Sequence, residues 1–255
     1  MAHPAVSRLP RSGGAAPLAR ALQRLPGDHP LPWRLRWLPV CASTELELEP
    51  WLASAAPPLA VVAQHQRFGQ GQRGRLWQSP RGGVWLSAAL PWPEHTTAAL
   101  SLAVALGLAL QLEALGLQPR IKWPNDLLLG ERKLAGVLPR LRWRGERVRH
   151  AQVGVGLNGW NPAPAGAINL AAALGHPRHP QARPDRLAAR VLRGLEWAVA
   201  AAEQPELVRR QAERRLWQPD GVEHQGRRWS VEGLALDGGL RLACAGEQVT
   251  LQRHF

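Results

Sequence analysis

The sequence has no tyrosine, two phenylalanines and one methionine, against twelve tryptophans. Indole rings must therefore supply nearly all the aromatic packing. Only two cysteines, Cys41 and Cys244, are present, and they lie far apart in the sequence. Two such cysteines exclude a disulfide framework and suit a reducing compartment, so we expect a cytoplasmic protein.

Long hydrophobic runs are also absent. The longest, Leu102–Leu110, has about half of the ~20 residues that a membrane-spanning helix needs. Residues 1–20 lack the continuous apolar stretch of a signal peptide. With 45% hydrophobic and 20% charged residues among 255, the composition is typical of a globular protein without membrane contact.

Lysine is scarce as well: of 32 basic Lys and Arg residues, only Lys122 and Lys133 are lysine. The net charge of +13 would suit nucleic-acid binding, because basic surfaces attract phosphate backbones. The arginines are scattered, however, apart from clusters at 140–149 and 209–215. We therefore attribute the charge to a preference for arginine on solvated faces and keep nucleic-acid binding as an alternative.

The pattern of apolar and turn-forming residues predicts an α+β fold, with a mixed sheet backed by helices and a small β-barrel at the C-terminus. Residues 1–30 are expected to be a loose Pro/Gly/Arg-rich tail, 31–217 a catalytic domain and 218–255 the barrel. The helix expected after Thr96 or Thr97 as its N-cap ends at Gly116. Strands are predicted at 36–40, 59–66, 84–90, 120–123, 133–143 and 147–158, and further helices at 183–203 and 205–217.

The stretch GQGQRG at 69–74 matches the pattern G-x-G-x-x-G. A dinucleotide-binding fold would need a helix directly after it, and Pro80 with Gly82-Gly83 argues against one. The G-K-[ST] of a P-loop is also missing. A polar, glycine-rich loop remains, which can close over an anionic ligand or be an ordinary surface loop.

Two further stretches carry chemistry. In KWPND, Lys122 lies near the end of a predicted strand, and in KLAG, Lys133 starts the next one. If these strands pair as a hairpin, both ammonium groups can project into one site. Gly136 removes a side chain where a ligand may approach closely. Asn158 and Asn161 in GVGLNGWN are further polar candidates or plain turn formers.

In this order, AQHQRFGQGQRGRLWQSP, IKWPNDLLLGERKLAGVL and VGVGLN resemble the biotin–protein ligases, over about residues 35–255. The resemblance implies their catalytic fold with an SH3-like C-terminal barrel. It implies that biotin's carboxylate attacks the α-phosphate of ATP to give biotinyl-5′-AMP and pyrophosphate. A lysine of a biotin carboxyl carrier protein, a subunit of acetyl-CoA carboxylase, then attacks the mixed anhydride.

The resemblance also implies roles for residues. Lys133 would contact biotin's carboxyl group and then the acyl phosphate, and Lys122 would lie on the ATP or Mg²⁺ side. Lysine suits a narrow anionic site because it is a compact point charge, whereas arginine is a wide fork. The implied catalytic residues are Lys133, Lys122 and Arg73. The implied biotin-binding residues are Ser43, Thr44, Glu45, Gln66, Gln70, Gly71, Gln72, Lys133 and Gly136, and the ATP-binding ones Arg73, Arg75, Trp77, Lys122, Asn125, Asp126 and Asn158.

The chain departs from the family's pattern at three positions. Gln70 and Gln72 stand where the loop often has arginines, which leaves fewer charges to hold an adenylate. Glu45 stands where asparagine usually follows the serine–threonine pair. Family members that also repress transcription carry an N-terminal winged helix, and residues 1–34 are too short for one, so we expect a ligase without DNA binding.

Several alternatives stay open. The oligomeric state is expected to be a monomer or a homodimer. A metal site at His176 and His179 is disfavoured, because their proline-rich loop has no Cys or acidic ligands nearby. A lipoate or octanoyl transferase would share the fold and an acyl-binding lysine. An arginine-rich nucleic-acid-binding module is the alternative from another class.

Overall fold

The computed structural model describes residues 15–95 and 98–252. A seven-stranded sheet lies at its centre, with strand order β1-β2-β3-β7-β6-β5-β4. β1 and β2 are parallel and all other neighbours are antiparallel. The strands are β1 (Arg34–Leu38), β2 (Leu59–Ala63), β3 (Val84–Leu90), β4 (Pro119–Lys122), β5 (Asp126–Leu129), β6 (Arg132–Arg144) and β7 (Arg147–Leu157).

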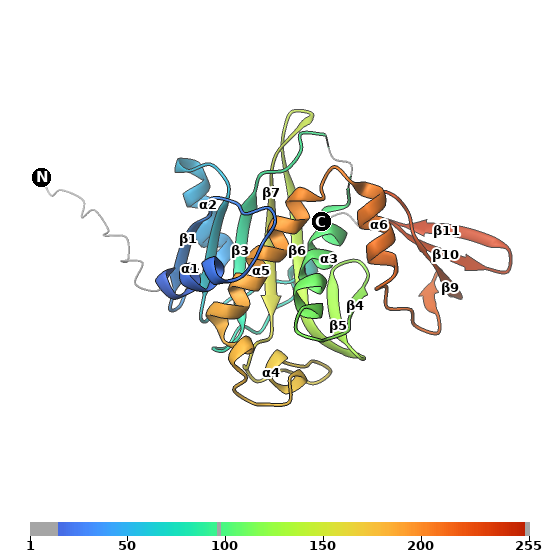
Figure 1. The fold of residues 1–255 in the computed structure, drawn as a ribbon. Helices are drawn as coiled ribbons and strands as arrows, with labels where there is room; N and C mark the ends of the chain where they lie inside the picture. Colours follow the sequence, from blue (N-terminus) through green and yellow to red (C-terminus); the bar gives the residue numbers. More distant parts are fainter. Residues whose placement is uncertain (1–14, 96–97, 253–255) are drawn as a thin grey trace, which may run out of the picture.

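Helices cover one face of this sheet (Figure 1). α3 (Leu100–Glu113) is apolar nearly all round and almost wholly buried, as its composition predicts. α5 (Pro184–Ala200) packs against it through Gly107 and Gly194, whose backbones approach so closely that a Cβ on Gly107 would lie 2.1 Å from the Gly194 carbonyl oxygen. The other helical elements are α1 (Ala15–Arg24), α2 (Thr44–Ser54), α4 (Leu170–Ala173), α6 (Pro205–Glu213) and the 3-10 turns η1 (Gln72–Gly74) and η2 (Pro180–Ala182).

The opposite face of the sheet is covered by a helix in one part and carries small and polar side chains in another. Because side chains alternate, β3 and β7 turn Leu86 and Val155 toward the helices and Ser87 and Gly154 to this other face. At one end, α2 packs on β2 and β3 around Leu48. The rest of the face carries small and polar residues, which leaves room for a cavity.

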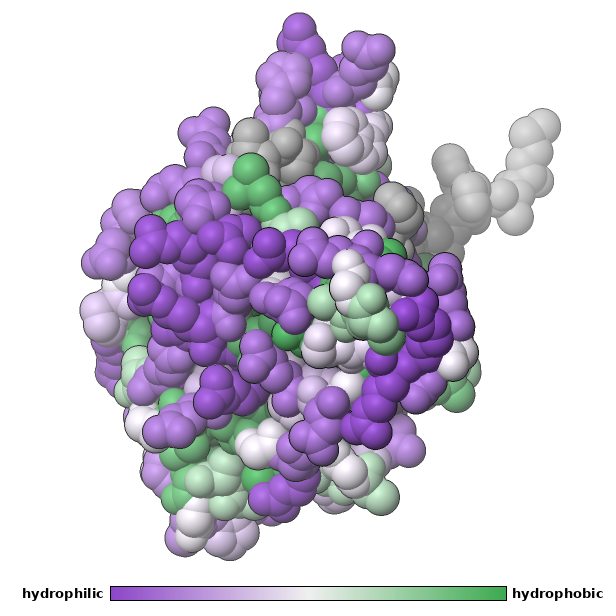
Figure 2. Space-filling view, turned by 90° about the vertical axis from the view of Figure 1, so that its right-hand side faces the viewer, coloured by the Kyte–Doolittle hydropathy of each residue, from purple (hydrophilic) through white to green (hydrophobic). Residues whose placement is uncertain are grey.

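The C-terminal strands β8 (Val222–His224), β9 (Arg227–Leu234), β10 (Leu240–Cys244) and β11 (Glu247–Leu251) form a four-stranded antiparallel sheet. It lies beside α6 (Figure 1). The predicted α+β fold is thereby confirmed, although no pairing among the described residues closes these four strands into a barrel. Seen from the side of this sheet, the molecular surface is mostly hydrophilic, with hydrophobic residues exposed in small patches (Figure 2).

Two hydrogen bonds attach the C-terminal sheet to the rest of the molecule. The Leu234 amide donates to Glu213 Oε1 over 2.9 Å, and Trp123 Nε1 donates to the Gly238 carbonyl over 2.8 Å. The Asp237-Gly238 pair forms the turn between β9 and β10, as predicted. Through these contacts the sheet is tied to α6 and to the turn after β4.

The structure differs from the sequence predictions at three elements, the first of which is α2, a helix over Thr44–Ser54 that the sequence did not predict. Residues 15–24, predicted to belong to a loose tail, form α1, because Leu18 and Leu22 are four apart and pack into the core. Residues 126–129 form β5, an additional strand between those of the two lysines. The proposed N-caps Thr96 and Thr97 lie outside the described residues, and the described helix begins at Leu100. No helix among the described residues has the length and apolarity to cross a membrane.

Candidate functional site

A cavity of about 330 Å³ opens on the face of the sheet opposite α3 and α5. Its walls come from the start of α2, the loop after β2, the turn before β5 and the adjoining parts of β3, β6 and β7. It brings together thirteen of the sixteen predicted site residues: Ser43, Thr44, Glu45, Gln66, Gln70, Gly71, Gln72, Arg75, Trp77, Asn125, Asp126, Lys133 and Gly136.

At the end of the cavity next to α2, a chain of hydrogen bonds connects the lining side chains. Gln66 Oε1 accepts from the Thr44 amide over 2.7 Å and from its hydroxyl over 3.0 Å. The Thr44 hydroxyl lies 2.8 Å from that of Ser87, and Gln66 Nε2 donates to Ser79 Oγ over 2.9 Å. Ser43 is the N-cap of α2. The side chains are thus fixed in a polar pocket that suits a ligand head group with both donors and acceptors.

Trp77 packs on a flat floor made by two glycines. Gly136 on β6 and Gly156 on β7 are direct partners in the sheet. A Cβ would lie 2.9 Å from the indole ring at Gly136 and 2.5 Å at Gly156, so a side chain at either position would displace the ring. The buried Trp77 Nε1 has no hydrogen-bond partner among the described residues.

Lys133 provides a positive charge beside Trp77 in the cavity. Its Nζ lies 2.7 Å from Asp126 Oδ2 and 4.8 Å from the centre of the Trp77 ring. Asp126 pairs with Gly136 across β5 and β6, so its side chain leaves the sheet on the same face as the glycine floor. The ammonium group is therefore oriented by a carboxylate and an indole ring, and its side chain is still 35% exposed to an incoming anion.

Three predicted residues do not line the cavity. The Lys122 Nζ lies 4.9 Å from the centre of the Trp217 ring, and β5 separates its strand from that of Lys133. The predicted hairpin between the strands of the two lysines is thus wrong: β4, β5 and β6 form a three-stranded meander instead. Arg73 is exposed in the turn η1, with a left-handed φ of 57°. Asn158 is buried, and its Nδ2 donates to the Ile168 carbonyl over 3.2 Å.

Some residues of the cavity were missed from sequence. Ser87 was read as part of an apolar strand, although a serine at an alternating position was a signal for a polar contact. Gly154 and Gly156 were read as a strand exit, and their i, i+2 spacing places both on one face of β7. Leu138 also lines the cavity, two residues beyond Gly136 on β6.

The glycine-rich loop folds back on itself. The Gly71 amide donates to the Arg75 carbonyl over 2.7 Å, and the Trp77 amide donates to the Gly69 carbonyl over 2.8 Å. Leu76 and Phe68 are 81% and 61% exposed. The loop therefore forms one wall of the cavity and is held mainly by its own hydrogen bonds.

Two buried titratable groups, neither of which lines the cavity, have shifted pKa values. Burial raises the pKa of the Cys41 thiol to about 11, helped by the negative charge of Glu47. Burial also lowers the pKa of His150, and the positive charges of Arg149 and Arg142 act in the same direction. At neutral pH both side chains are therefore uncharged.

A metal ion has little protein support here. The described residues contain no group of three or more His, Cys, Asp or Glu side chains that could hold one. The acidic side chains that line the cavity, Glu45 and Asp126, are each paired with a cation. Mg²⁺ commonly binds through one or two carboxylates and the phosphates of a nucleotide, and Asp126 fits the protein's share of such a site.

Comparison with known proteins matches residues 39–158 to the biotin/lipoate A/B protein ligase family. The chain is 39% identical over 102 residues to the bifunctional ligase/repressor BirA of Bacillus subtilis, covering 38% of this chain and 31% of that protein. It is 37% identical over 129 residues to the biotin–[acetyl-CoA-carboxylase] ligase of Paracoccus denitrificans, covering 48% of this chain and 52% of that one. The chain thus spans about a third to a half of these relatives' lengths.

The fold is also that of solved relatives. The biotin protein ligase of Aquifex aeolicus, in complex with biotin and ATP, superposes with a TM-score of 0.70 at 24% identity. This similarity covers 86% of the present chain and 95% of the Aquifex chain. The structural likeness shows a shared fold, and the sequence match is confined to the N-terminal part of that fold. Over residues 39–158, the sequence is similar to the biotin/lipoate A/B protein ligase family.

Proposed function

We propose that this protein is a biotin–protein ligase that uses ATP to form biotinyl-5′-AMP and transfers the biotinyl group to a lysine of a biotin carboxyl carrier protein. The observation that carries the proposal is the arrangement of the cavity. Lys133 lies beside Asp126 and Trp77, whereas Thr44, Gln66 and Ser87 form a polar pocket on the α2 side. A ligand with an anionic tail and a polar head group matches such a cavity.

In the first step, the carboxylate of biotin and the α-phosphate of ATP must approach although both are negative. Lys133 would donate to a carboxylate oxygen and then stabilise the charge that develops on the phosphoryl oxygens. Asp126 orients the ammonium group until the substrate arrives. Arg75 and the backbone amides of the glycine-rich loop would bind the nucleotide phosphates, and the Trp77 ring would contact the nucleotide.

The other assigned roles are proposals of the same kind. Ser43, Thr44 and Gln66 would bind the ureido ring, next to Glu45, Gln70, Gly71, Gln72 and Gly136. Asn125 and Asp126 would serve the ATP side, with Mg²⁺ held mainly by the phosphates. Lys122, Arg73 and Asn158 would have to act from outside the walls of the cavity, so we give them a lesser part.

In the second step, the acceptor lysine of the carrier attacks the acyl carbon of the mixed anhydride, and AMP leaves. The relative from Paracoccus denitrificans, whose name includes the acetyl-CoA carboxylase, supports a carrier of that kind. The unpaired state of Cys41 and Cys244 suits a reducing compartment, so we place the reaction in the cytoplasm.

Biotin-dependent exchange of pyrophosphate into ATP tests the proposal directly, with purified protein and no carrier. We expect exchange with biotin and much less with lipoate or octanoate. Exchange that responds to lipoate and not to biotin would replace the proposal with a lipoate-type enzyme, which the family also includes. Salt-sensitive binding of DNA or RNA without adenylation of any acid would replace it with a nucleic-acid-binding function.

A further inference from the structure

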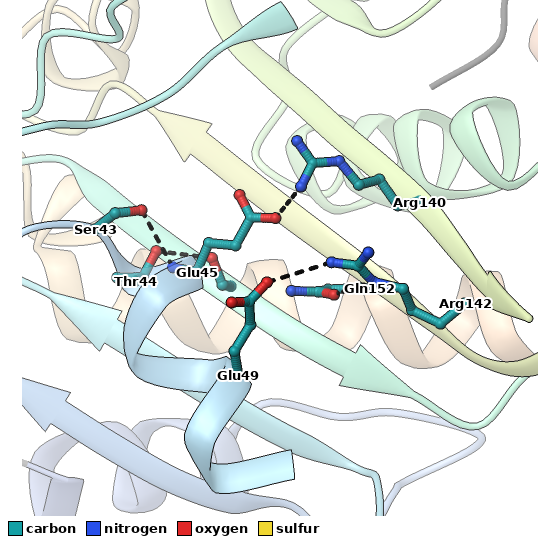
Figure 3. Close-up of polar contacts among 8 residues, drawn as sticks. Ser43, Thr44, Glu45, Glu49, Arg140, Arg142 and Gln152 are labelled. Carbon is teal, nitrogen blue, oxygen red and sulfur yellow. Dashed lines mark hydrogen bonds and ion pairs between the residues drawn. The ribbon is translucent and has the colours of Figure 1, made fainter. Parts of the chain in front are cut away.

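Two ion pairs join α2 to β6 (Figure 3). Glu45, in the first turn of α2, pairs with Arg140, and Glu49, one turn later, pairs with Arg142 over 3.4 Å. The Glu45 side chain is 17% exposed and lines the cavity, whereas the Glu49 side chain is 51% exposed and does not. The inner pair can therefore affect a ligand in a way that the outer pair cannot.

The inner pair lies where the floor of the cavity ends. Alternate residues of β6 face the cavity, first Gly136 and then Leu138, and Arg140 is the next one on that face. On β7, Gly154 lines the cavity, and Gln152, the sheet partner of Arg140, is buried beyond it. Arg140 and Gln152 do not line the cavity, so its floor ends at Leu138 and Gly154, and Glu45, paired with Arg140, lies at this end.

Glu45 is also part of the turn that presents the predicted head-group ligands. Its backbone amide donates to Ser43 Oγ over 3.3 Å, and Thr44 precedes it directly. Arg140 lies on the strand that carries Lys133 near its start. The pair therefore connects the turn at the head-group end to the strand of the lysine at the other end.

We propose that Arg140 is a positioning residue for the acyl substrate, which acts by holding the carboxylate of Glu45 at the end wall of the cavity. The proposal rests on the proposed ligase function. Without Arg140, the half-buried carboxylate has lost its charged partner and must turn to solvent or toward the ligand. Either movement shifts Ser43 and Thr44, and a carboxylate turned inward repels the carbonyl oxygen of the ureido ring.

The test is steady-state pyrophosphate exchange with the substitution Arg140→Gln. We expect the KM for biotin to rise about tenfold, because the unpaired charge weakens binding at the head-group end. The kcat and the KM for ATP should change less than about threefold, since Lys133 and the glycine-rich loop keep their contacts. A loss confined to the KM for biotin separates positioning of the acyl group from general damage.

The double variant Glu45→Gln/Arg140→Gln tests the mechanism. Neither charge is then left alone, and two amides can hydrogen-bond, so the KM for biotin should be at least about threefold lower than that of Arg140→Gln, although the loss of the Glu45 carboxylate from the cavity keeps it above that of the wild type. Arg144→Gln is the matched control for Arg140→Gln, because it removes an exposed arginine from the same strand. Glu49→Gln is the control for loss of the outer pair. Both controls should keep the KM for biotin within about twofold.

A double variant no better than Arg140→Gln would overturn the proposal, as would a control that raises the KM for biotin equally. The proposal would also be overturned if kcat fell, or the KM for ATP rose, by as large a factor as the KM for biotin rises. Such a result would point to a merely structural pair. Absence of biotin-dependent exchange in the wild-type protein would be a different outcome. It contradicts the proposed function itself and removes the ground for Arg140 as well.

Discussion

Lys122 and Lys133 are alike in sequence but not in surroundings. Lys133 lines the cavity beside Asp126, and Lys122 packs its ammonium group over Trp217. Both lysines are rare in an arginine-rich chain, and neither composition nor spacing distinguishes their surroundings. The difference arises because β5 lies between their strands and the chain turns twice rather than once.

Substitution of each lysine by arginine should therefore give different results. In Lys133→Arg the charge remains, but the planar guanidinium group does not fit between carboxylate and phosphate, so kcat/KM for biotin should fall by about a hundredfold. Lys122→Arg should lose less than about tenfold, because arginine also packs on an indole ring. Pyrophosphate exchange measures both, and near-normal activity of Lys133→Arg would refute the argument from side-chain shape.

His150 predicts how stability depends on pH. Its folded-state pKa is lowered by burial, so the unfolded chain binds a proton more readily. The resulting stability is present above the ordinary histidine pKa of about 6.5 and is lost as the pH falls through the lowered value. The Tm of the wild type should therefore fall more between pH 7.5 and 5.5 than that of His150→Gln. Parallel pH profiles of the two proteins in thermal unfolding would argue against this role.

At the scale of elements, the glycine-rich loop is the wall of the cavity with the least support. Its hydrogen bonds are mostly internal, and Leu76 and Phe68 are exposed rather than packed. Gln70 and Gln72 in this loop carry no charge. The loop is thus suited to close over a nucleotide and to open again.

Amide hydrogen exchange can follow this closure. Without ligand, amides of residues 70–76 should exchange at least about tenfold faster than those of β3, since little buried contact protects them. With biotin and ATP together, exchange in the loop should slow markedly, while β3 serves as the internal standard. A loop equally protected in both states would contradict its role as a lid.

The elements also show how far sequence reasoning reaches. β3 was predicted with its observed bounds, because Gly82-Gly83 and Pro91 delimit a clear apolar run. β5 was missed, since four residues between turn formers show no period. Thirteen site residues were found from motifs, but Ser87 and Arg140 act through partners 43 and 95 residues away. Only the folded sheet brings such residues together.

At the scale of the whole molecule, the C-terminal sheet is linked to the main part by few polar contacts. Glu213 is central, because its carboxylate accepts from the Leu234 amide and pairs with Arg209 over 2.7 Å. Its neighbour Arg241 lies 3.6 Å away on β10. This residue thus joins α6 to two strands of the C-terminal sheet.

Glu213→Ala should loosen that sheet. Loss of a hydrogen-bonded carboxylate that leaves the Leu234 amide without its partner should cost about 1–3 kcal/mol of local stability. Limited trypsin digestion should then cut faster within β9, at Arg227 or Arg228, while the affinity for biotin stays close to that of the wild type. Glu223→Ala, an exposed glutamate on β8, is the control. Equal cleavage of both variants would contradict the role of Glu213.

The position of α1 has a practical consequence. α1 packs on α5, and α5 covers the face of the sheet opposite the cavity (Figure 1). Two side chains of α5 hold the segment after α1: Arg193 donates to the Leu25 carbonyl, and Glu196 accepts from the Leu31 amide and from Trp33 Nε1. A purification tag or a reporter protein fused directly to Ala15 would therefore begin on the side of the sheet away from the cavity, where it leaves the opening of the cavity free.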